Sequence, residues 1–120
     1  MKPDPHSWAC DLTQLFDEVW TRVTRGVHDR HAPARHPTLA TVTPDGRPQA
    51  RTVVLRAADK VAGTVHVHTD LQSGKVRDLR ATPFAALHVW DASAHLQLRL
   101  EAQVTILTGP DVAAIWERVA

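Results

Sequence analysis

The sequence lacks the features that mark several large classes of protein. Its 120 residues include one cysteine, Cys10, so no disulfide can form within the chain, and a reducing cytoplasm is the expected compartment. No apolar run approaches the ~18 residues of a membrane span, and residues 1–10 lack the apolar core of a signal peptide. The formal net charge is only +1, whereas nucleic-acid-binding proteins are usually strongly basic. We therefore expect a cytoplasmic protein that binds neither membranes nor nucleic acid.

Motifs of common enzyme sites are also missing. There is no Gly-x-Gly-x-x-Gly fingerprint, no Walker-type phosphate loop and no Gly-x-Ser-x-Gly nucleophile elbow. His66 and His68 alternate on an expected strand, but no acidic residue or cysteine completes a metal-ligand set at a recognisable spacing. Cys10 has no evident activating partner. The sequence therefore predicts no metal site and identifies no catalytic residue.

The composition that remains is that of one ordinary folded domain, with 43% apolar and 22% charged residues. Residues 1–10 are expected to form a loose arm. Over residues 11–27 the apolar side chains recur every three or four positions, which predicts an amphipathic helix with Asp11 as its N-cap. A second helix is predicted over residues 110–119, because proline is favoured in a first helical turn.

Between these helices the pattern changes to the alternation typical of strands. Strands are expected at residues 38–43, 49–56, 64–69, 84–90 and 95–107. A Pro-Asp-Gly-Arg turn joins the first two, and a short helix over residues 73–81 separates the third from the fourth. This order predicts a mostly β fold, a small antiparallel β-barrel over residues 38–107 with flanking helices. The last strand is long enough to bend and serve two sheets.

Some residues have the chemistry of a phosphate site. Arg51 begins an apolar strand segment, and Ser73 and Lys75 lie at the start of the short helix. A lysine there opposes the helix dipole, which is easier to explain if an anion lies between them. Taken alone, Arg51 is better explained as a surface residue of a strand, and Ser73 is also simply a good helix cap. Gln97 and Arg99 share the polar face of the last strand, which is either exposed to solvent or lines a cleft.

Four segments in order also match one family's pattern. Its Arg-x-Val-Leu-Leu-Lys resembles Arg51-Thr-Val-Val-Leu-Arg56, and its aromatic-Tyr-Thr-x-x-x-Ser-Arg-Lys resembles the stretch from Val67 to Lys75. Its Asn-Pro and following strand resemble residues 81–90, and its Arg-Gln-Val-Arg-Val-x-Gly strand resembles residues 96–102. Over about residues 38–116 the chain therefore resembles the pyridoxamine 5'-phosphate oxidase-like FMN-binding proteins. The resemblance implies an antiparallel, Greek-key-like split barrel, the cofactor FMN and an oxidoreductase activity on an undetermined small molecule.

The resemblance also implies roles for single residues. The FMN phosphate would be held by Arg51, Ser73 and Lys75. Thr52, Val53 and Val54 would also bind the cofactor, and His68 and Thr69 would lie along the flavin. Gln97 and Arg99 would reach it from the second subunit of a homodimer. Arg56 takes the place of the lysine that meets the substrate phosphate in true oxidases, which implies a substrate-binding role.

Two departures from the family pattern leave a second interpretation open. Gly74 stands where the family has an arginine, which removes one bidentate phosphate partner. The sequence also ends before the strands that supply a tryptophan and an arginine to the family's site, so we expect a truncated form of a longer protein. The alternative to an enzyme is therefore a non-catalytic barrel that binds a flavin or another ligand without turnover.

Overall fold

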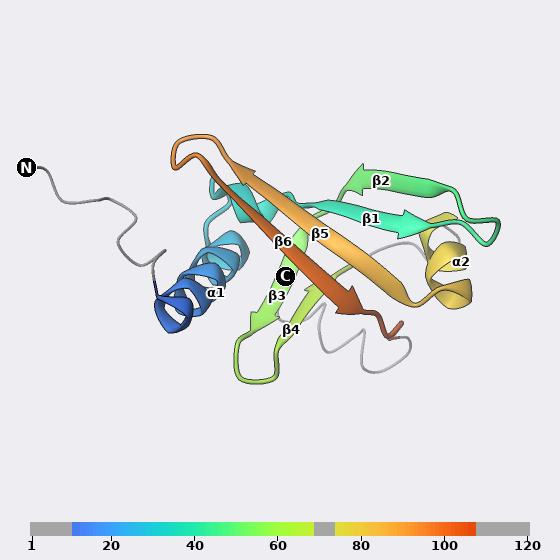
Figure 1. Cartoon of the computed structure of the whole chain (residues 1–120), viewed down its shortest axis with the longest axis horizontal. Coiled ribbons are helices and arrows are strands. Elements are labelled where there is room, and N and C mark those ends of the chain that lie inside the picture. Colours follow the sequence, from blue (N-terminus) through green and yellow to red (C-terminus); the bar gives the residue numbers. More distant parts are fainter. Residues whose placement is uncertain (1–10, 69–73, 108–120) are drawn as a thin grey trace, which may run out of the picture.

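Two unequal antiparallel sheets lie between helices at opposite ends of the molecule (Figure 1). The computed structural model describes residues 11–68 and 74–107. The larger sheet has the strand order β2-β1-β5-β6, and the smaller sheet pairs β3 with β4. The elements in chain order are α1 (Leu12–His28), the 3-10 helix η2 (Pro33–Arg35), β1 (Thr38–Val42), β2 (Pro48–Thr52), β3 (Leu55–Asp59), β4 (Thr64–Val67), α2 (Gly74–Ala81), β5 (Phe84–Asp91) and β6 (Leu96–Gln103).

Several predictions concern residues outside the described part of the chain. These are the loose arm over residues 1–10, the final helix over residues 110–119, and the roles of Thr69 and Ser73. Nothing in the structure tests them, and the division of the chain into one domain also stays a prediction.

Helix α1 begins where its capping residue predicts. The Asp11 carboxylate accepts hydrogen bonds from the backbone N–H groups of Thr13 at 2.8 Å and Gln14 at 3.0 Å. The helix continues through Gly26 and ends at His28. Gly26 is buried where α1 packs against η2. A Cβ atom at Gly26 would lie 2.5 Å from the carbonyl carbon of Ala34. Glycine is thus the residue that allows this close approach.

The first hairpin has the turn that its sequence predicts. Gly46 has a φ of +89°, a conformation that residues with a Cβ rarely adopt, and its N–H donates to the Thr43 carbonyl at 2.9 Å. Strand β1 pairs with β2 on one side and with β5 on the other, and β6 extends the sheet beyond β5. This places β1 inside the larger sheet, where Leu39 and Thr41 are buried on one face.

The structure corrects the prediction of a single strand over residues 49–56. The segment breaks at Val53 and Val54, so that β2 belongs to the larger sheet and β3 to the smaller one. The Val53 N–H donates to the Pro37 carbonyl at 2.9 Å, which satisfies this group at the break. Val53 and Leu55 are both buried, so the segment continues to direct side chains into the interior across the change of sheet. This segment serves the two sheets, whereas β6 pairs only with β5 among the described strands.

The interior consists of two connected apolar clusters. One packs α1 and η2 against both sheets, and the other lies between the sheets around Leu39, Val53 and Leu87. The mostly β, antiparallel fold with flanking helices is confirmed. Within the described residues β4 and β6 do not pair with each other, so the barrel is open on that side. No helix within residues 11–68 and 74–107 is long and apolar enough to cross a membrane.

Candidate functional site

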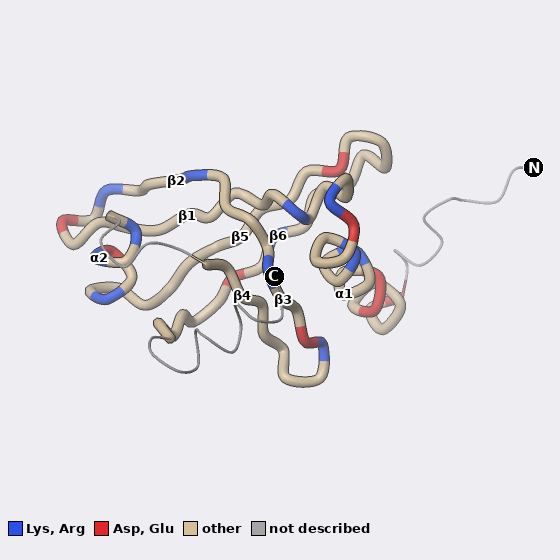
Figure 2. Tube along the Cα trace, turned by 180° about the vertical axis from the view of Figure 1, so that it is seen from behind, with Lys and Arg blue, Asp and Glu red and all other residues tan. Residues whose placement is uncertain are grey.

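Positive charge gathers at the end of the molecule opposite α1 (Figure 2). Helix α2 carries Lys75, Arg77 and Arg80, and the neighbouring hairpin carries Arg47 and Arg51. Asp78 and Asp45 lie among them, so the region is not uniformly basic. An anionic group is the ligand chemistry that this end of the molecule favours.

Arg51 is held firmly on the inner face of β2. One of its terminal nitrogens, Nη1, donates to the Thr41 hydroxyl at 2.7 Å and to the Leu39 carbonyl at 3.3 Å. The other, Nη2, lies 4.0 Å from the carboxylate of Asp78 on α2. The Arg51 side chain is 27% exposed and that of Asp78 is 4% exposed. Arg51 is therefore not an ordinary surface residue, and its guanidinium group reaches solvent beside α2.

Lys75 lies on the same side of α2 as Asp78, because residues three apart on a helix are neighbours. Arg51 contacts Asp78, so the two predicted phosphate-binding cations, Arg51 and Lys75, lie close to the same part of α2. Gly74 begins the helix, and a Cβ atom placed there would meet nothing within 4 Å. The start of α2 thus has open space where the family's arginine would stand.

A groove of about 580 Å³ runs between the two sheets, next to this charged region. Its walls are mostly apolar and come from both open sheet edges, from α2 and from the larger sheet. The volume lies within the range of roughly 300–1,000 Å³ that is usual for small-ligand sites. The lining at α2 and the two sheet edges includes Val65, Val67, His68, Val76, Leu79, Arg99, Leu100, Val104 and Ile106.

His68, at the end of β4, is the polar residue that the resemblance places along the flavin. It lines the groove and is half-buried. Burial, and then the positive charges of Arg56 and His66, lower the pKa of His68 below its usual value of 6.5. His68 is therefore predominantly neutral at pH 7. Arg56 is half-buried on β3 and close enough to influence His68, which is compatible with its predicted substrate-binding role.

The predicted residues Gln97 and Arg99 lie on the other face of the larger sheet. The strand register aligns Arg51, Leu39, Leu87 and Leu100 in one row across the four strands. The adjacent row consists of Thr52, Thr38, His88 and Arg99. Successive residues of a strand point to opposite faces, so Arg51 faces inward and Arg99 outward. One chain therefore does not direct both arginines to the same side of the sheet.

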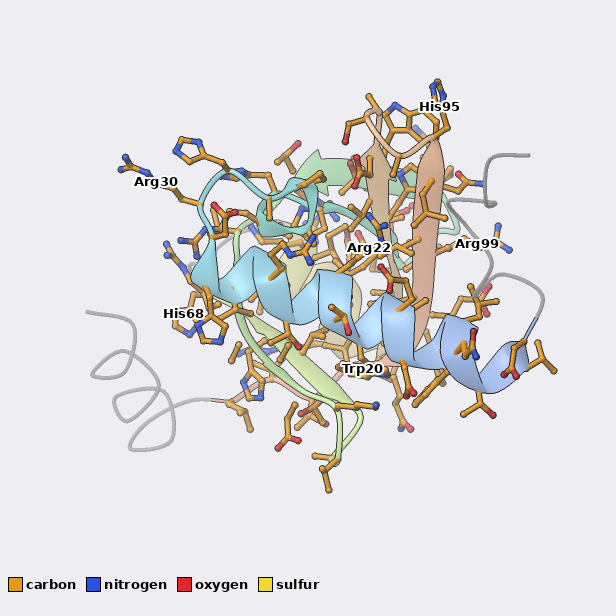
Figure 3. The ribbon with its side chains drawn as sticks, turned by 90° about the vertical axis from the view of Figure 1, so that its left-hand side faces the viewer. Trp20, Arg22, Arg30, His68, His95 and Arg99 are labelled. Carbon is orange, nitrogen blue, oxygen red and sulfur yellow. The ribbon has the colours of Figure 1, made fainter. Side chains whose placement is uncertain are left out.

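The outward face is exposed and of mixed character. His88 Nε2 and Gln97 Oε1 lie 2.9 Å apart, and both Gln97 and Arg99 are exposed. Figure 3 shows His68 and Arg99 on opposite sides of the molecule. Phe84 and Trp90 add large apolar surface to the same face as Arg99, with 58% and 55% of each exposed.

The structure places Arg51 beside Asp78 of α2, the helix that carries Lys75 and contributes Val76 and Leu79 to the groove. Gln97 and Arg99 project from the outward face of β6, where Arg99 also borders the groove at the edge of the sheet. Of the residues on the second strand that are predicted to bind the cofactor, Val53 is buried, Val54 is half-buried at the break, and Thr52 points outward. Sequence reasoning missed Thr41 and Asp78, which contact Arg51. The burial of Thr41 could have been predicted from the alternation of β1, because Thr41 lies two residues from Leu39 and shares its face. Nothing in the sequence indicated that Asp78 is buried.

Comparison with known proteins decides the family. The model of the pyridoxamine 5'-phosphate oxidase FMN-binding domain matches residues 13–108. The chain belongs to this family of FMN-binding domains. The predicted family and its cofactor, FMN, are therefore confirmed. The match therefore includes nearly all of α1 and every residue that lines the groove.

Curated members of the family share parts of this FMN-binding domain. A pyridoxine/pyridoxamine 5'-phosphate oxidase from Gloeothece citriformis is 45% identical over 67 residues, which is 56% of this chain and 30% of that protein. The Arabidopsis thaliana pyridoxine/pyridoxamine 5'-phosphate oxidase 2 is 26% identical over 104 residues, which is 82% of this chain and 52% of that protein. The chain thus spans about half or less of these relatives.

Solved structures support the same fold. A pyridoxamine 5'-phosphate oxidase-related FMN-binding protein from Nostoc punctiforme aligns with a TM-score of 0.61 at 25% identity, covering 87% of this chain and 49% of that one. An F420 reductase aligns with a TM-score of 0.58 at 23% identity, covering 70% of this chain and 65% of that one. The FMN-binding split-barrel fold is therefore confirmed. Among the described residues no group of three or more His, Cys, Asp or Glu side chains could hold a metal ion.

Proposed function

We propose that this protein holds FMN between two copies of the chain and acts as a flavin-dependent oxidoreductase. The observation that carries the proposal is a largely apolar groove bordered by Val76 and Leu79 of α2, the helix that carries Lys75 and whose Asp78 meets Arg51. A flavin mononucleotide has the complementary form, with a charged phosphate at one end and a broad, mostly apolar ring at the other. The donor set fits the cofactor: Arg51 and Lys75 for the phosphate, and the groove between the sheets for the ring.

The phosphate end rests on charge. Arg51 can donate to phosphate oxygens through Nε and Nη2, since Nη1 is occupied by Leu39 and Thr41. Lys75 adds a mobile ammonium group near the start of α2. Ser73 stays a predicted phosphate ligand outside the described residues.

At the ring end the protein supplies position and polarity. When bound, the isoalloxazine ring accepts a hydride from a reduced substrate. His68 would face it as a neutral imidazole, and the apolar groove walls would exclude water. Arg56 would bind an anionic group of the substrate, since it lies near His68 on the adjoining strand. We assign no proton transfer to any of these residues.

A second copy of the chain would complete the site. Gln97 and Arg99 project from the outward face of the edge strand β6, and Arg99 borders the groove only at that edge, so we propose that both reach the flavin from a partner. The exposed Phe84 and Trp90 on this face support such a contact, because large exposed apolar side chains are typical of interfaces. We therefore propose a homodimer, and a cytoplasmic location on the strength of the single cysteine.

The first test is titration with FMN and with riboflavin, which lacks the phosphate. Binding is measured by the quenching of fluorescence. FMN should bind more tightly than riboflavin. Lys75→Ala should weaken FMN about tenfold or more and leave riboflavin unchanged, since a charge-assisted hydrogen bond contributes about 1.5–3 kcal/mol. Arg77→Ala is the matched control, because Arg77 is exposed on the same helix and points away from Lys75. Failure to bind either flavin would contradict the proposed function.

The second candidate function is flavin binding without turnover. Gly74 favours it, because the arginine missing there removes one phosphate contact. The two functions differ in a simple spectroscopic measurement. An oxidoreductase loaded with FMN should lose its absorbance near the visible flavin band when a reduced nicotinamide or a reduced substrate is added without oxygen. A protein that binds FMN but is never reduced would support the non-catalytic function.

A further inference from the structure

Thr41 is a buried polar residue between two charged side chains, Arg51 and Asp78, of which only Arg51 is predicted to bind the phosphate. It lies on β1, inside the larger sheet, and only 3% of its surface is exposed. Its hydroxyl oxygen accepts the Arg51 Nη1 hydrogen bond at 2.7 Å. The same hydroxyl donates to the Asp78 carboxylate at 3.3 Å. Thr41 therefore connects β1, β2 and α2 through one hydroxyl group.

The direction of these bonds is fixed by the chemistry of the two neighbours. A guanidinium group can only donate hydrogen bonds, and a carboxylate can only accept them. The Thr41 hydrogen must therefore point to Asp78, which leaves the oxygen lone pairs for Arg51. Because Asp78 sets this orientation, the hydroxyl always presents an acceptor to the guanidinium group.

Keeping this group of side chains inside the protein is costly. Asp78 is 3% exposed, and its Oδ1 atom has no hydrogen-bond partner within the described part of the chain. A buried carboxylate oxygen without a partner opposes folding. Apolar side chains at Thr41 and Asp78 would join the neighbouring Leu39 and Leu79 without that cost. A role beyond packing accounts for the retention of polar groups here.

The consequence for Arg51 is a fixed guanidinium plane. Both hydrogens of Nη1 are engaged, one by Thr41 and one by the Leu39 carbonyl. Two anchored acceptors determine the orientation of a planar fork, so Nε and Nη2 keep a fixed direction. A side chain held this way loses less conformational freedom when it binds a phosphate than a mobile arginine does.

We propose that Thr41, with its hydroxyl oriented by Asp78, is a positioning residue that holds Arg51 ready for the phosphate of FMN. The inference rests on the proposed function, in which Arg51 binds that phosphate. Thr41 itself touches no ligand. Its contribution is to prepare the arginine before the cofactor arrives.

The test compares Thr41→Val with Thr41→Ser in FMN and riboflavin titrations. Valine keeps the shape of threonine without the hydroxyl, and should reduce the preference for FMN over riboflavin about fivefold to tenfold. Serine keeps the hydroxyl and should restore the preference. A residue that only stabilises the fold would change both affinities together, so the ratio separates the two roles. If the valine variant does not fold, Thr41→Cys replaces it, because a thiol is a weak hydrogen-bond acceptor.

A double-mutant cycle with Arg51→Ala completes the experiment. Once Arg51 is absent, Thr41→Val should have no further effect on the FMN-to-riboflavin ratio. An unchanged ratio in the Thr41→Val protein, or equal and additive losses in the Arg51→Ala background, would overturn the inference. Wild-type protein that binds FMN and riboflavin equally would instead contradict the phosphate role of Arg51. Thermal unfolding of each variant confirms that the titrated protein is folded.

Discussion

Single residues around α2 determine how much positive charge a bound phosphate meets. Arg51 is partly offset by Asp78, whose carboxylate lies 4.0 Å away. Lys75 is half-buried on the same side of the helix, and Gly74 contributes no charge. The predicted phosphate site is therefore weaker than one with the family's additional arginine, and its strength can be raised by substitution.

Gly74→Arg should strengthen FMN binding. The position opens into space with no atom within 4 Å of a Cβ, so an arginine can be accommodated without strain. A new charge-assisted hydrogen bond to the phosphate should raise the FMN affinity by about tenfold while leaving riboflavin unchanged. Ala81→Arg is the control, since it adds the same charge at the far, exposed end of α2. Equal gains from both variants, measured by titration, would indicate general electrostatic attraction rather than a defined contact.

His68 should make the stability of the protein depend on pH. Its pKa in the folded protein is below 6.5, first because of burial and then because of Arg56 and His66. Below about pH 6.5 the unfolded chain binds a proton that the folded protein does not, so the free energy of unfolding falls as the pH decreases. His68→Gln should reduce this dependence in urea titrations between pH 7 and pH 5. His31→Gln, at an exposed residue, should leave it unchanged. Identical pH slopes in the wild type and His68→Gln would show that His68 is not responsible.

At the scale of elements, α1 contacts the rest of the fold through polar or close-packed residues at three places. Near its centre Arg22 forms ion pairs with Glu18 at 2.8 Å and with Asp91 of β5 at 2.9 Å. Near its end the helix meets η2 at Gly26. Toward its start the Asp17 carboxylate accepts a hydrogen bond from Lys60, beyond β3, at 2.6 Å. These contacts set the direction of α1 across the end of the fold (Figure 1).

Gly26→Ala should destabilise the protein although alanine favours helices. The added Cβ would lie 2.5 Å from the Ala34 carbonyl carbon and 2.7 Å from its Cβ, so α1 and η2 must separate. The gain in helix propensity is about 1 kcal/mol, and overpacking of a tight contact costs about 1–3 kcal/mol. Denaturant unfolding should therefore show a lower midpoint. Thr21→Ala, on the exposed side of α1, serves as the control and should change little. A higher midpoint for Gly26→Ala would mean that η2 moves freely.

At the scale of the whole molecule, the two faces of the larger sheet have different uses. The inner face carries Arg51 and packs against the smaller sheet and α2, whereas the outer face carries Arg99 and exposed aromatic residues. This difference is the physical reason for proposing a dimer, because Gln97 and Arg99 project from the face opposite to Arg51.

Trp90→Glu should separate the proposed dimer. A charge placed in the apolar part of an interface is costly to bury, so light scattering should change from twice the chain mass of 13.3 kDa to a single chain mass. FMN affinity should fall as well, because Gln97 and Arg99 of the partner would be lost. Val61→Glu is the matched control, since Val61 is apolar and 99% exposed in the turn between β3 and β4. If the wild-type protein is a monomer and still binds FMN tightly, the proposed contribution of a partner to the site is wrong.

The sequence alone determined the local structure and the family. Asp11 capped the first helix, the Asp-Gly turn set the first hairpin, and the motifs around Arg51 and Lys75 identified an FMN-binding domain. Each of these features depends on residues that are close in the chain, where capping, turn geometry and alternation act directly. A family motif works in the same way, since it compares residue types at fixed spacing.

Only the tertiary structure decided which side chains meet. The break at Val53 and Val54 depends on which strands pair with each half of the segment, and the alternation within the segment is the same for one strand as for two. The contacts of Thr41 with Arg51 and Asp78 join the first hairpin to α2, which lies 37 residues further along the chain at Asp78. The opposite orientation of Arg51 and Arg99 follows from register across four strands, a property of pairing rather than of any one strand.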